Sequence, residues 1–183
     1  NGVMGLLSSR VPIWGRGWPD FATDWLNSAF GWIQLYFTFA GLSALALGVA
    51  FMLGLRLEEN FNKPWVARNL IEFWTRWHMT LSLWCKDYVF NPITALSRSP
   101  LLGICIAMLA IGIWHETSLY YVLWSFWQAL GIVLSRSIPS YFPAVANHPK
   151  LQQVQPILGP ITVLGWLSLA QPVLTRLLEV SHI

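Results

Sequence analysis

The sequence contains little charge and almost no cysteine. Only 10% of its 183 residues are Asp, Glu, Lys or Arg, whereas a typical soluble domain carries about 25%. Two cysteines, Cys85 and Cys105, are too few for a disulfide framework and are expected to be buried free thiols. The net charge of +3 and the 55% hydrophobic content exclude a basic nucleic-acid-binding protein and a disordered chain.

Several sequence motifs are also absent. Residues 1–20 lack the charged start, apolar run and cleavage site of a secretory signal peptide. Because the sequence begins with Asn, we expect a piece of a longer protein. The sequence has no HExxH, no GxSxG elbow and no glycine-rich phosphate loop, and the histidines lack partners at ligand spacing, so a metal site is not expected.

Apolar and aromatic residues are abundant instead. Twelve residues are Trp, and the mean hydropathy of +0.51 indicates an integral membrane protein. Residues 29–55 carry no charge and, as a helix, measure roughly 40 Å, enough to cross a hydrocarbon core of about 30 Å with tilt. Ala40, Ala44 and Gly48 are four residues apart, which predicts that this helix packs closely against others.

The pattern along the chain predicts a single partial membrane domain built from six segments. These are a loop and interfacial stretch (1–28), a transmembrane helix (29–55), an amphipathic or re-entrant segment (56–98), a broken helical pair around His115 (100–134), a loop (135–156) and a C-terminal apolar helix (157–179).

The amphipathic segment combines charge with aromatic side chains. More than half of the charged residues lie in it, and the spacing of Glu72 and Arg76 predicts an ion pair. A helix is predicted over residues 69–90, because large side chains recur at helical spacing. This stripe consists of Phe73, Trp77, Leu81, Trp84 and Tyr88.

His115 is the first candidate for chemistry. As one straight helix, residues 100–134 would measure roughly 52 Å, too long for a bilayer, so a break is predicted near residues 115–118. The break would place His115 at depth in the membrane, where ionisable residues are usually functional. A neutral imidazole there can act as a general base. The alternative is a structural histidine bonded to a backbone carbonyl at the break.

The other ionisable candidates are weaker. His78 has Trp74 and Ser82 one helical turn away on either side, but an interfacial histidine among aromatics is the more common explanation. Glu116 must be protonated, paired or facing water, and a direct dyad with His115 is not expected because adjacent helical residues point about 100° apart. His148 and His182 are expected to be solvated.

Five blocks of the sequence form a recognisable set. They are YFTFAG (36–41), ENFNKPW (59–65), EFWTRWHMTLSLW (72–84) followed by Asp87-Tyr88, GIWH (112–115) and YVLW (121–124). Together they resemble the membrane-bound O-acyltransferase family, and most closely its bacterial branch of alginate O-acetylases and teichoic acid D-alanylation proteins. The blocks occur in the family's order. Thr38, Leu42 and Glu116 depart from what this branch commonly carries, and these departures bear on acceptor contacts and on the charge beside His115.

The resemblance implies an all-α integral membrane fold. It is a multi-helix transmembrane bundle with re-entrant and half-spanning helices around a central tunnel, of which this chain would be the C-terminal part. His115 matches the catalytic base, and His78 matches the second conserved polar position. We expect further side chains to bind substrate, namely Trp74, Trp77, Trp114, Ser82 and Asn62.

The implied reaction is transfer of an acyl group, acetyl or similarly small, from a thioester to a hydroxyl of an extracytoplasmic polysaccharide or cell-wall polymer. The donor would be acyl-CoA or an acyl-carrier protein, with no bound cofactor and no metal. The expected location is the bacterial inner membrane, as a multi-pass protein in contact with lipid and with envelope-complex partners, and no nucleic acid is involved. The alternative is a transporter or channel subunit in which His115 and Glu116 line a proton or substrate path.

Overall fold

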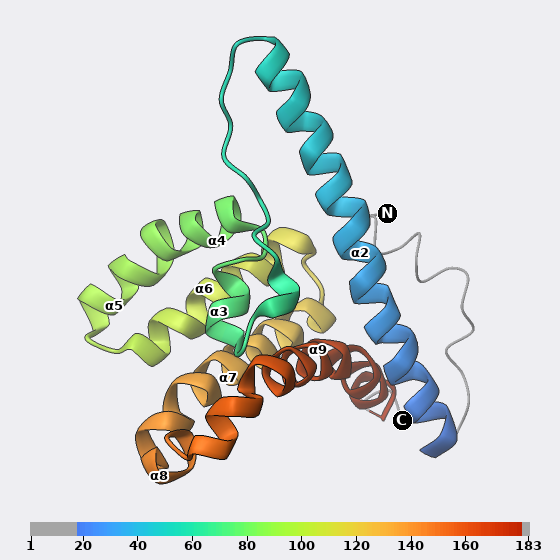
Figure 1. The fold of residues 1–183 in the computed structure, drawn as a ribbon, viewed down its shortest axis with the longest axis vertical. Coiled ribbons are helices and arrows are strands. Elements are labelled where there is room, and N and C mark those ends of the chain that lie inside the picture. Colours follow the sequence, from blue (N-terminus) through green and yellow to red (C-terminus); the bar gives the residue numbers. More distant parts are fainter. Residues whose placement is uncertain (1–17, 181–183) are drawn as a thin grey trace.

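The computed structural model describes residues 18–180, and this part of the chain is helical, without strands (Figure 1). One long N-terminal helix stands beside a bundle formed by the later helices. The elements are α2 (Trp18–Met52), the 3₁₀ turn η1 (Pro64–Val66), α3 (Leu70–Trp74), α4 (Met79–Cys85), the π-helical turn η2 (Lys86–Phe90), α5 (Asn91–Ser97), α6 (Pro100–His115), α7 (Leu119–Tyr141), α8 (Pro143–Ala146) and α9 (Pro149–Val180).

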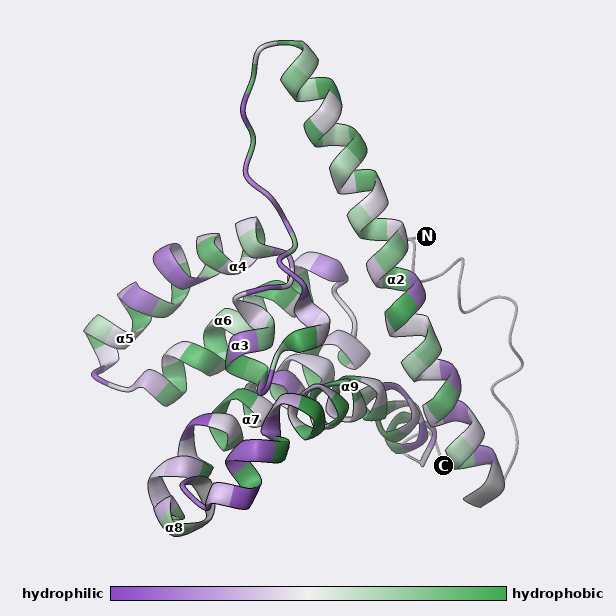
Figure 2. Ribbon diagram, in the orientation of Figure 1, coloured by the Kyte–Doolittle hydropathy of each residue, from purple (hydrophilic) through white to green (hydrophobic). Residues whose placement is uncertain are grey.

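Two helices in the described part are long and apolar enough to cross a membrane. They are Asp20–Met52 of α2 and Pro149–Glu179 of α9. The 35 residues of α2 measure roughly 52 Å at about 1.5 Å per residue, which exceeds a hydrocarbon core of about 30 Å. Figure 2 shows a largely hydrophobic C-terminal half of α2, followed by a polar loop that returns toward the bundle.

The N-terminal half of α2 packs against α9. The Trp25 indole donates a hydrogen bond to Ser168 Oγ (2.7 Å), and the Trp32 indole donates one to the Leu167 carbonyl (3.1 Å). An ion pair between Asp24 and Arg176 (2.8 Å) joins the two helices near the C-terminal end of α9. These contacts fix α2 against the bundle through polar groups on an otherwise apolar helix.

The sequence prediction for residues 1–55 needs two corrections. Helix α2 begins at Trp18, so the predicted loop is wrong over residues 18–28, and residues 1–17 lie outside the described part. The predicted close packing of Ala44 and Gly48 is not found among the described residues. A Cβ at Gly41 or Gly48 would meet nothing within 4 Å, because the C-terminal half of α2 projects away from the bundle (Figure 1).

Helices α6 and α7 form the centre of the bundle. Ser99 accepts a hydrogen bond from the Leu102 N–H at the start of α6, and Ser118 accepts one from the Tyr121 N–H at the start of α7. These serine caps satisfy backbone donors that have no partner within their own helix. The break lies at residues 116–118, where the length of the apolar segment predicted it.

Close approach of α6 and α7 depends on Gly112, which is buried. A Cβ at this position would lie 2.7 Å from the Tyr121 carbonyl oxygen and would also strike Ser125 Oγ. An alanine must therefore push the two helices apart, and overpacking of this kind typically costs about 1–3 kcal/mol.

We expect Gly112→Ala to lower the unfolding temperature of the full-length protein in detergent and to reduce its acyl transfer, because His115 lies one turn further along α6. Gly41→Ala is the matched control. Its Cβ meets nothing within 4 Å, so it is expected to be neutral or to stabilise α2 by up to about 1 kcal/mol. Equal unfolding temperatures for the two variants would show that the α6–α7 contact is not tight.

The predicted loop at residues 135–156 is also wrong in large part. Helix α7 continues to Tyr141, the short α8 follows, and α9 begins at Pro149. Two of the prolines that suggested a loop, Pro143 and Pro149, open α8 and α9, where the missing N–H costs nothing. Pro139 and Pro156 lie inside α7 and α9, and these helices continue through them.

Candidate functional site

The predicted helix over residues 69–90 is interrupted at residues 75–78. The cause is the incoming segment at residues 60–62, which pairs with this stretch of backbone. The Asn62 N–H donates to the Arg76 carbonyl (2.9 Å), the Met79 N–H donates to the Asn60 carbonyl (2.8 Å), and Phe61 and Trp77 form an isolated antiparallel bridge. Because the Arg76 carbonyl and the Met79 N–H bond to another segment, they do not form the hydrogen bonds of a continuous helix.

Polar contacts around Glu72 secure the same turn. The Arg68 backbone N–H donates to the Glu72 carboxylate (2.9 Å), and the Arg76 guanidinium donates two hydrogen bonds to it (2.8 and 3.1 Å). The Arg68 N–H is the main reason that the pKa of Glu72 lies below its ordinary value. The predicted pair of Glu72 and Arg76 is thereby confirmed, and Arg76 also reaches the Asn62 carbonyl (3.1 Å).

His78 stands at the break, immediately before α4. Its backbone is left-handed (φ 44°, ψ 55°), a conformation that costs a non-glycine residue roughly 1–2 kcal/mol. The imidazole is partly buried, and its Nδ1 makes no hydrogen bond within the described part of the chain. The ring lies edge-on to Phe39 (4.9 Å between centroids) and to Trp114 (5.9 Å). The break therefore presents His78 to aromatic side chains of α2 and α6.

His115 is the last residue of α6, and its side chain is exposed on one side. Its ring stacks on Tyr121 (5.5 Å between centroids, 13° between planes) and lies edge-on to Trp124 (5.9 Å) and Trp114 (4.8 Å). Three aromatic rings thus hold the imidazole without enclosing it. A ligand can reach the exposed side of the ring.

The two histidines come together around one indole. His78 and His115 are 37 positions apart in the sequence, yet both rings contact Trp114. Each histidine lies at a helix boundary, where the backbone leaves room for a side chain to project. The arrangement offers two imidazoles that can exchange protons with a ligand lying over Trp114.

The other predicted site residues have different surroundings. Trp74 contacts Trp124 (6.2 Å between centroids) and thereby supports the aromatic ring set around His115. The Ser82 hydroxyl donates to the Trp77 carbonyl (3.0 Å), so it fixes the turn. The predicted placement of Trp74 and Ser82 on one continuous helical face with His78 is wrong, because the helix breaks at His78.

Asn62, Glu116 and His148 are exposed. Asn62 holds Arg76 through its backbone. Glu116 ends α6 in an extended conformation, and its N–H donates to the Gly112 carbonyl (3.1 Å). His182 lies outside the described residues. Within the described part, no three His, Cys, Asp or Glu side chains gather as metal ligands would.

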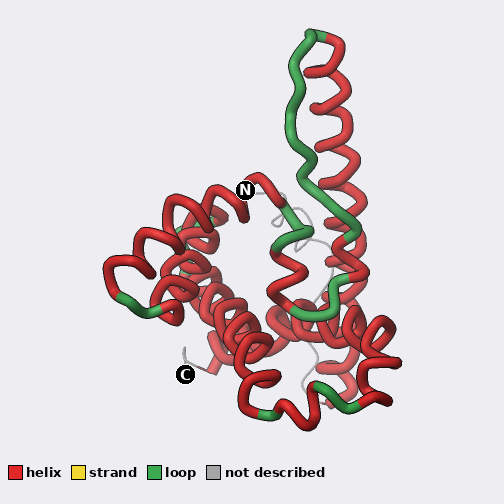
Figure 3. The backbone as a smooth tube through the Cα atoms, turned by 60° about the vertical axis from the view of Figure 1, so that its left-hand side comes forward, coloured by secondary structure: helices red, strands yellow, loops and turns green. Residues whose placement is uncertain are grey.

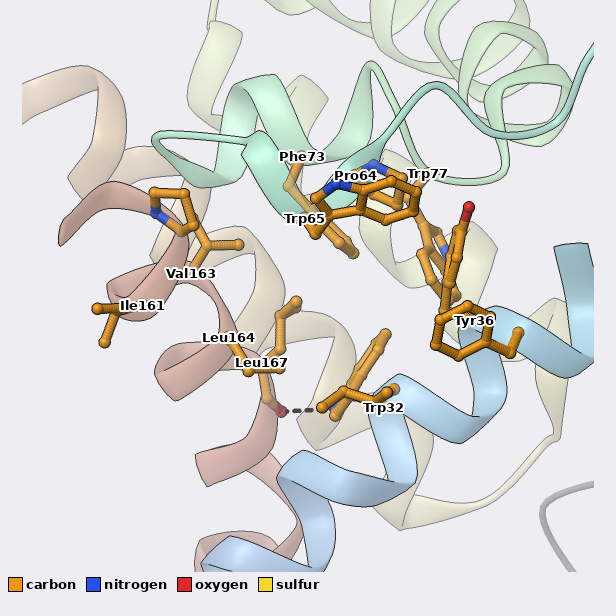
Figure 4. Close-up of a pocket in the computed structure, with 13 residues that line it drawn as sticks. Trp32, Tyr36, Pro64, Trp65, Phe73, Trp77, Ile161, Val163, Leu164 and Leu167 are labelled. Atoms are coloured by element: carbon orange, nitrogen blue, oxygen red, sulfur yellow. Dashed lines mark hydrogen bonds between the residues drawn. The ribbon is translucent and has the colours of Figure 1, made fainter. Parts of the chain in front are cut away.

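An apolar cavity of about 330 Å³ adjoins Trp77. Figure 4 shows it between α2, the η1–α3 segment and α9, with the Trp32 indole bonded to the Leu167 carbonyl at its base. Trp77 is the only predicted substrate-binding residue in its wall, where it stacks on Phe73 (5.5 Å, 19°). The other wall residues are mainly aromatic and aliphatic, among them Tyr36, Trp65, Val163 and Leu164.

Three aromatic side chains that touch the histidines are not among the residues predicted from the sequence. Tyr121 and Trp124 pack on His115, and Phe39 packs on His78. All three lie within the blocks YVLW and YFTFAG that carry the family resemblance. The signal was therefore available in those blocks, but which residues touch which ring depends on the fold.

Comparison with known proteins identifies relatives of this chain. Residues 10–171 match the membrane-bound O-acyltransferase (MBOAT) family. A probable alginate O-acetylase, AlgI, of Pseudomonas aeruginosa is 33% identical over 152 residues, which cover 81% of this chain and 28% of the relative. A teichoic acid D-alanyltransferase of Streptococcus thermophilus is 35% identical over 112 residues, or 56% of this chain and 27% of the relative.

A peptidoglycan O-acetyltransferase of Helicobacter pylori is 30% identical over 121 residues, or 64% of this chain and 23% of the relative. The chain therefore spans less than a third of the length of these relatives. The family match extends over most of the sequence and includes both helix breaks. The chain belongs to the membrane-bound O-acyltransferase family.

Proposed function

We propose that this chain carries the acyl-transfer centre of a membrane-bound O-acyltransferase that modifies a cell-envelope polymer. The acyl group, acetyl or similarly small, moves from a thioester to a hydroxyl of the polymer. The observation that carries the proposal is the meeting of His78 and His115 around Trp114. Relatives are named for acyl transfer to alginate, teichoic acid and peptidoglycan, which supports an acceptor of this class.

His115 acts as the general base in this proposal. Its imidazole removes the proton from the acceptor hydroxyl, and the oxygen attacks the thioester carbonyl carbon. The carbon–sulfur bond then breaks, and the departing thiolate takes the proton from the imidazolium. Stacking on Tyr121 holds the ring in one orientation, and His115 is exposed, so substrate can reach it. General-base catalysis of this kind contributes about 10²–10⁴-fold to a rate.

His78 assists by holding a substrate or by polarising the thioester carbonyl. Its left-handed backbone is fixed by the hydrogen bonds of the neighbouring residues 76 and 79 to the incoming segment. The ring is therefore positioned before substrate arrives, and preorganised dipoles stabilise the charge that develops on the carbonyl oxygen. Trp74, Trp77 and Trp114 shape the substrate site in this proposal.

The remaining features of the proposal concern the whole protein. It is a multi-pass protein of the bacterial inner membrane, with re-entrant and half-spanning helices around a tunnel. Acyl-CoA or an acyl-carrier protein delivers the acyl group, and envelope proteins form a complex with it. The apolar helices α2 and α9 and the family match support this location.

Mass spectrometry of cell-envelope polymers tests the function. We expect deletion of the full-length gene to remove an ester-linked acyl group from one polymer, and the wild-type gene to restore it. A gene carrying Gly41→Ala should restore it equally, because the added Cβ would meet no described residue within 4 Å. An unchanged ester content in all polymers would contradict the proposal. Proton flux through the purified protein in liposomes without any acyl donor would instead support a channel or transporter.

A further inference from the structure

We propose that a second pocket, next to His78, binds the sugar-polymer acceptor, an inference that rests on the proposed function. The pocket measures about 590 Å³ and lies between the C-terminal half of α2 and the returning segment at residues 56–60. Figure 3 shows this segment running back along α2. Its polar wall residues are Ser43, Arg56, Glu58, Asn60 and Thr80.

Three of these polar side chains form a connected set. The Thr80 hydroxyl donates to Asn60 Oδ1 (2.6 Å), and Asn60 Nδ2 donates to Ser43 Oγ (3.1 Å). Each group can form further hydrogen bonds, because a hydroxyl has two acceptor lone pairs and an amide nitrogen has a second hydrogen. The set therefore presents fixed donors and acceptors of the kind that bind hydroxyl groups of a ligand.

The pocket shares residues with the contacts around His78. Phe39 lies in its wall and contacts the His78 ring edge-on (4.9 Å). Asn60 lies in the wall as well, and its carbonyl accepts the N–H of Met79, the residue after His78. A polymer seated in this pocket would thus place one of its units beside His78.

The charges of the pocket select among ligands. Arg56 and Glu58 carry opposite signs, so the wall has no formal excess of positive charge. A nucleotide or phosphopantetheine donor would need several cations for its phosphates. Hydroxyl-rich units fit better, because the wall combines polar side chains with apolar ones such as Leu42 and Ala46, and so offers both hydrogen bonds and contact for sugar C–H groups.

The two pockets differ in the chemistry of their walls. The cavity beside Trp77 is almost wholly apolar, whereas the pocket beside His78 carries the polar set. Aromatic rings lie between them: Tyr36 and Phe39 both contact Phe61 (5.5 and 5.0 Å between centroids). The polar acceptor is therefore assigned to the pocket beside His78 and not to the cavity.

Equilibrium binding to the full-length protein in lipid nanodiscs tests this assignment. The acceptor probe is an oligomer of N-acetylglucosamine, an uncharged sugar polymer, and coenzyme A is the donor probe. We expect saturable binding of the oligomer. Ala46→Trp fills the pocket and should weaken that binding by about tenfold or more, equivalent to about 1.4 kcal/mol. Coenzyme A should bind the variant as it binds the wild type.

Ala44→Trp is the matched control, because Ala44 is exposed on the same helix outside the pocket wall, and it should bind the oligomer within about twofold of wild type. Ser43→Ala removes one hydroxyl with little change of shape and should weaken binding by about threefold to tenfold.

Three results would overturn the assignment: no oligomer binding by wild type, unchanged binding by Ala46→Trp and Ser43→Ala, or loss of coenzyme A binding instead. The envelope ester measurement is independent, so it separates failure of this pocket from failure of the proposed function.

Discussion

Replacing His115 with Ala is expected to reduce acyl transfer by the full-length protein about 10²–10⁴-fold. The loss follows because His115 is the proposed base and, among the ring contacts of Trp114 in the described part of the chain, His78 is the other imidazole. Stability should change little, since the His115 side chain is exposed and its removal leaves no closed cavity. Transfer is measured with purified enzyme, a thioester donor and the envelope polymer found by mass spectrometry.

His148→Ala is the matched control for this experiment. His148 is exposed and precedes α9, away from both helix breaks, so its replacement should leave the rate unchanged. If His115→Ala folds, inserts and transfers acyl groups at the wild-type rate, His115 is not the base. The proposed mechanism would then be wrong even if the envelope ester depends on the gene.

Replacing His78 is expected to have the second-largest effect, a loss of about tenfold to 10²-fold in kcat. Two variants separate the ring from the backbone. His78→Ala removes the imidazole but keeps an unfavourable left-handed residue, whereas His78→Gly removes the imidazole and accepts φ 44° without strain. We therefore expect both variants to lose activity, and the glycine variant to unfold at a higher temperature than the alanine variant.

Thermal unfolding and acyl transfer, measured on the same preparations, distinguish the two roles of His78. His78→Asn is a further variant, since Asn adopts the left-handed region more readily than most residues and keeps a polar side chain. It should retain more activity than His78→Ala. Recovery of full activity by His78→Gly would mean that only the backbone turn matters, which contradicts a role for the ring.

The break after His115 could be predicted from the sequence because it follows from a length. An uninterrupted apolar helix over residues 100–134 exceeds the thickness of a bilayer, and the residues between His115 and Leu119 include Ser118, a good helix cap. The prediction needed only local composition and the dimensions of the membrane. For the same reason the long apolar helices α2 and α9 were predicted, although their ends were not.

The break at His78 could not be predicted from periodicity. The stripe of large side chains from Phe73 to Tyr88 has helical spacing, and nothing in that stretch forbids a helix. The interruption comes from residues 60–62, whose backbone pairs with Arg76 and Met79. This tertiary contact overrides the local helix propensity. The break can therefore be seen only in the folded structure.

The ends of α2, α7 and α9 were misplaced because polar and proline residues were interpreted as loops. Pro143 and Pro149 begin helices, and a proline at a helix start leaves the same local signal as a proline in a turn. For the site, the family blocks point to His78 and His115, and the structure brings both rings to Trp114. The ring contacts of Phe39, Tyr121 and Trp124 required the structure.

One measurement tests the central claim most directly: a structure of the full-length protein with a non-hydrolysable thioester analogue. The account predicts the analogue's carbonyl group over Trp114 with the His78 ring beside it. The His115 imidazole should lie where it can reach, directly or through one water, an acceptor hydroxyl placed for attack on the carbonyl carbon. An analogue bound away from Trp114, or His78 and His115 separated by other side chains, would contradict the account.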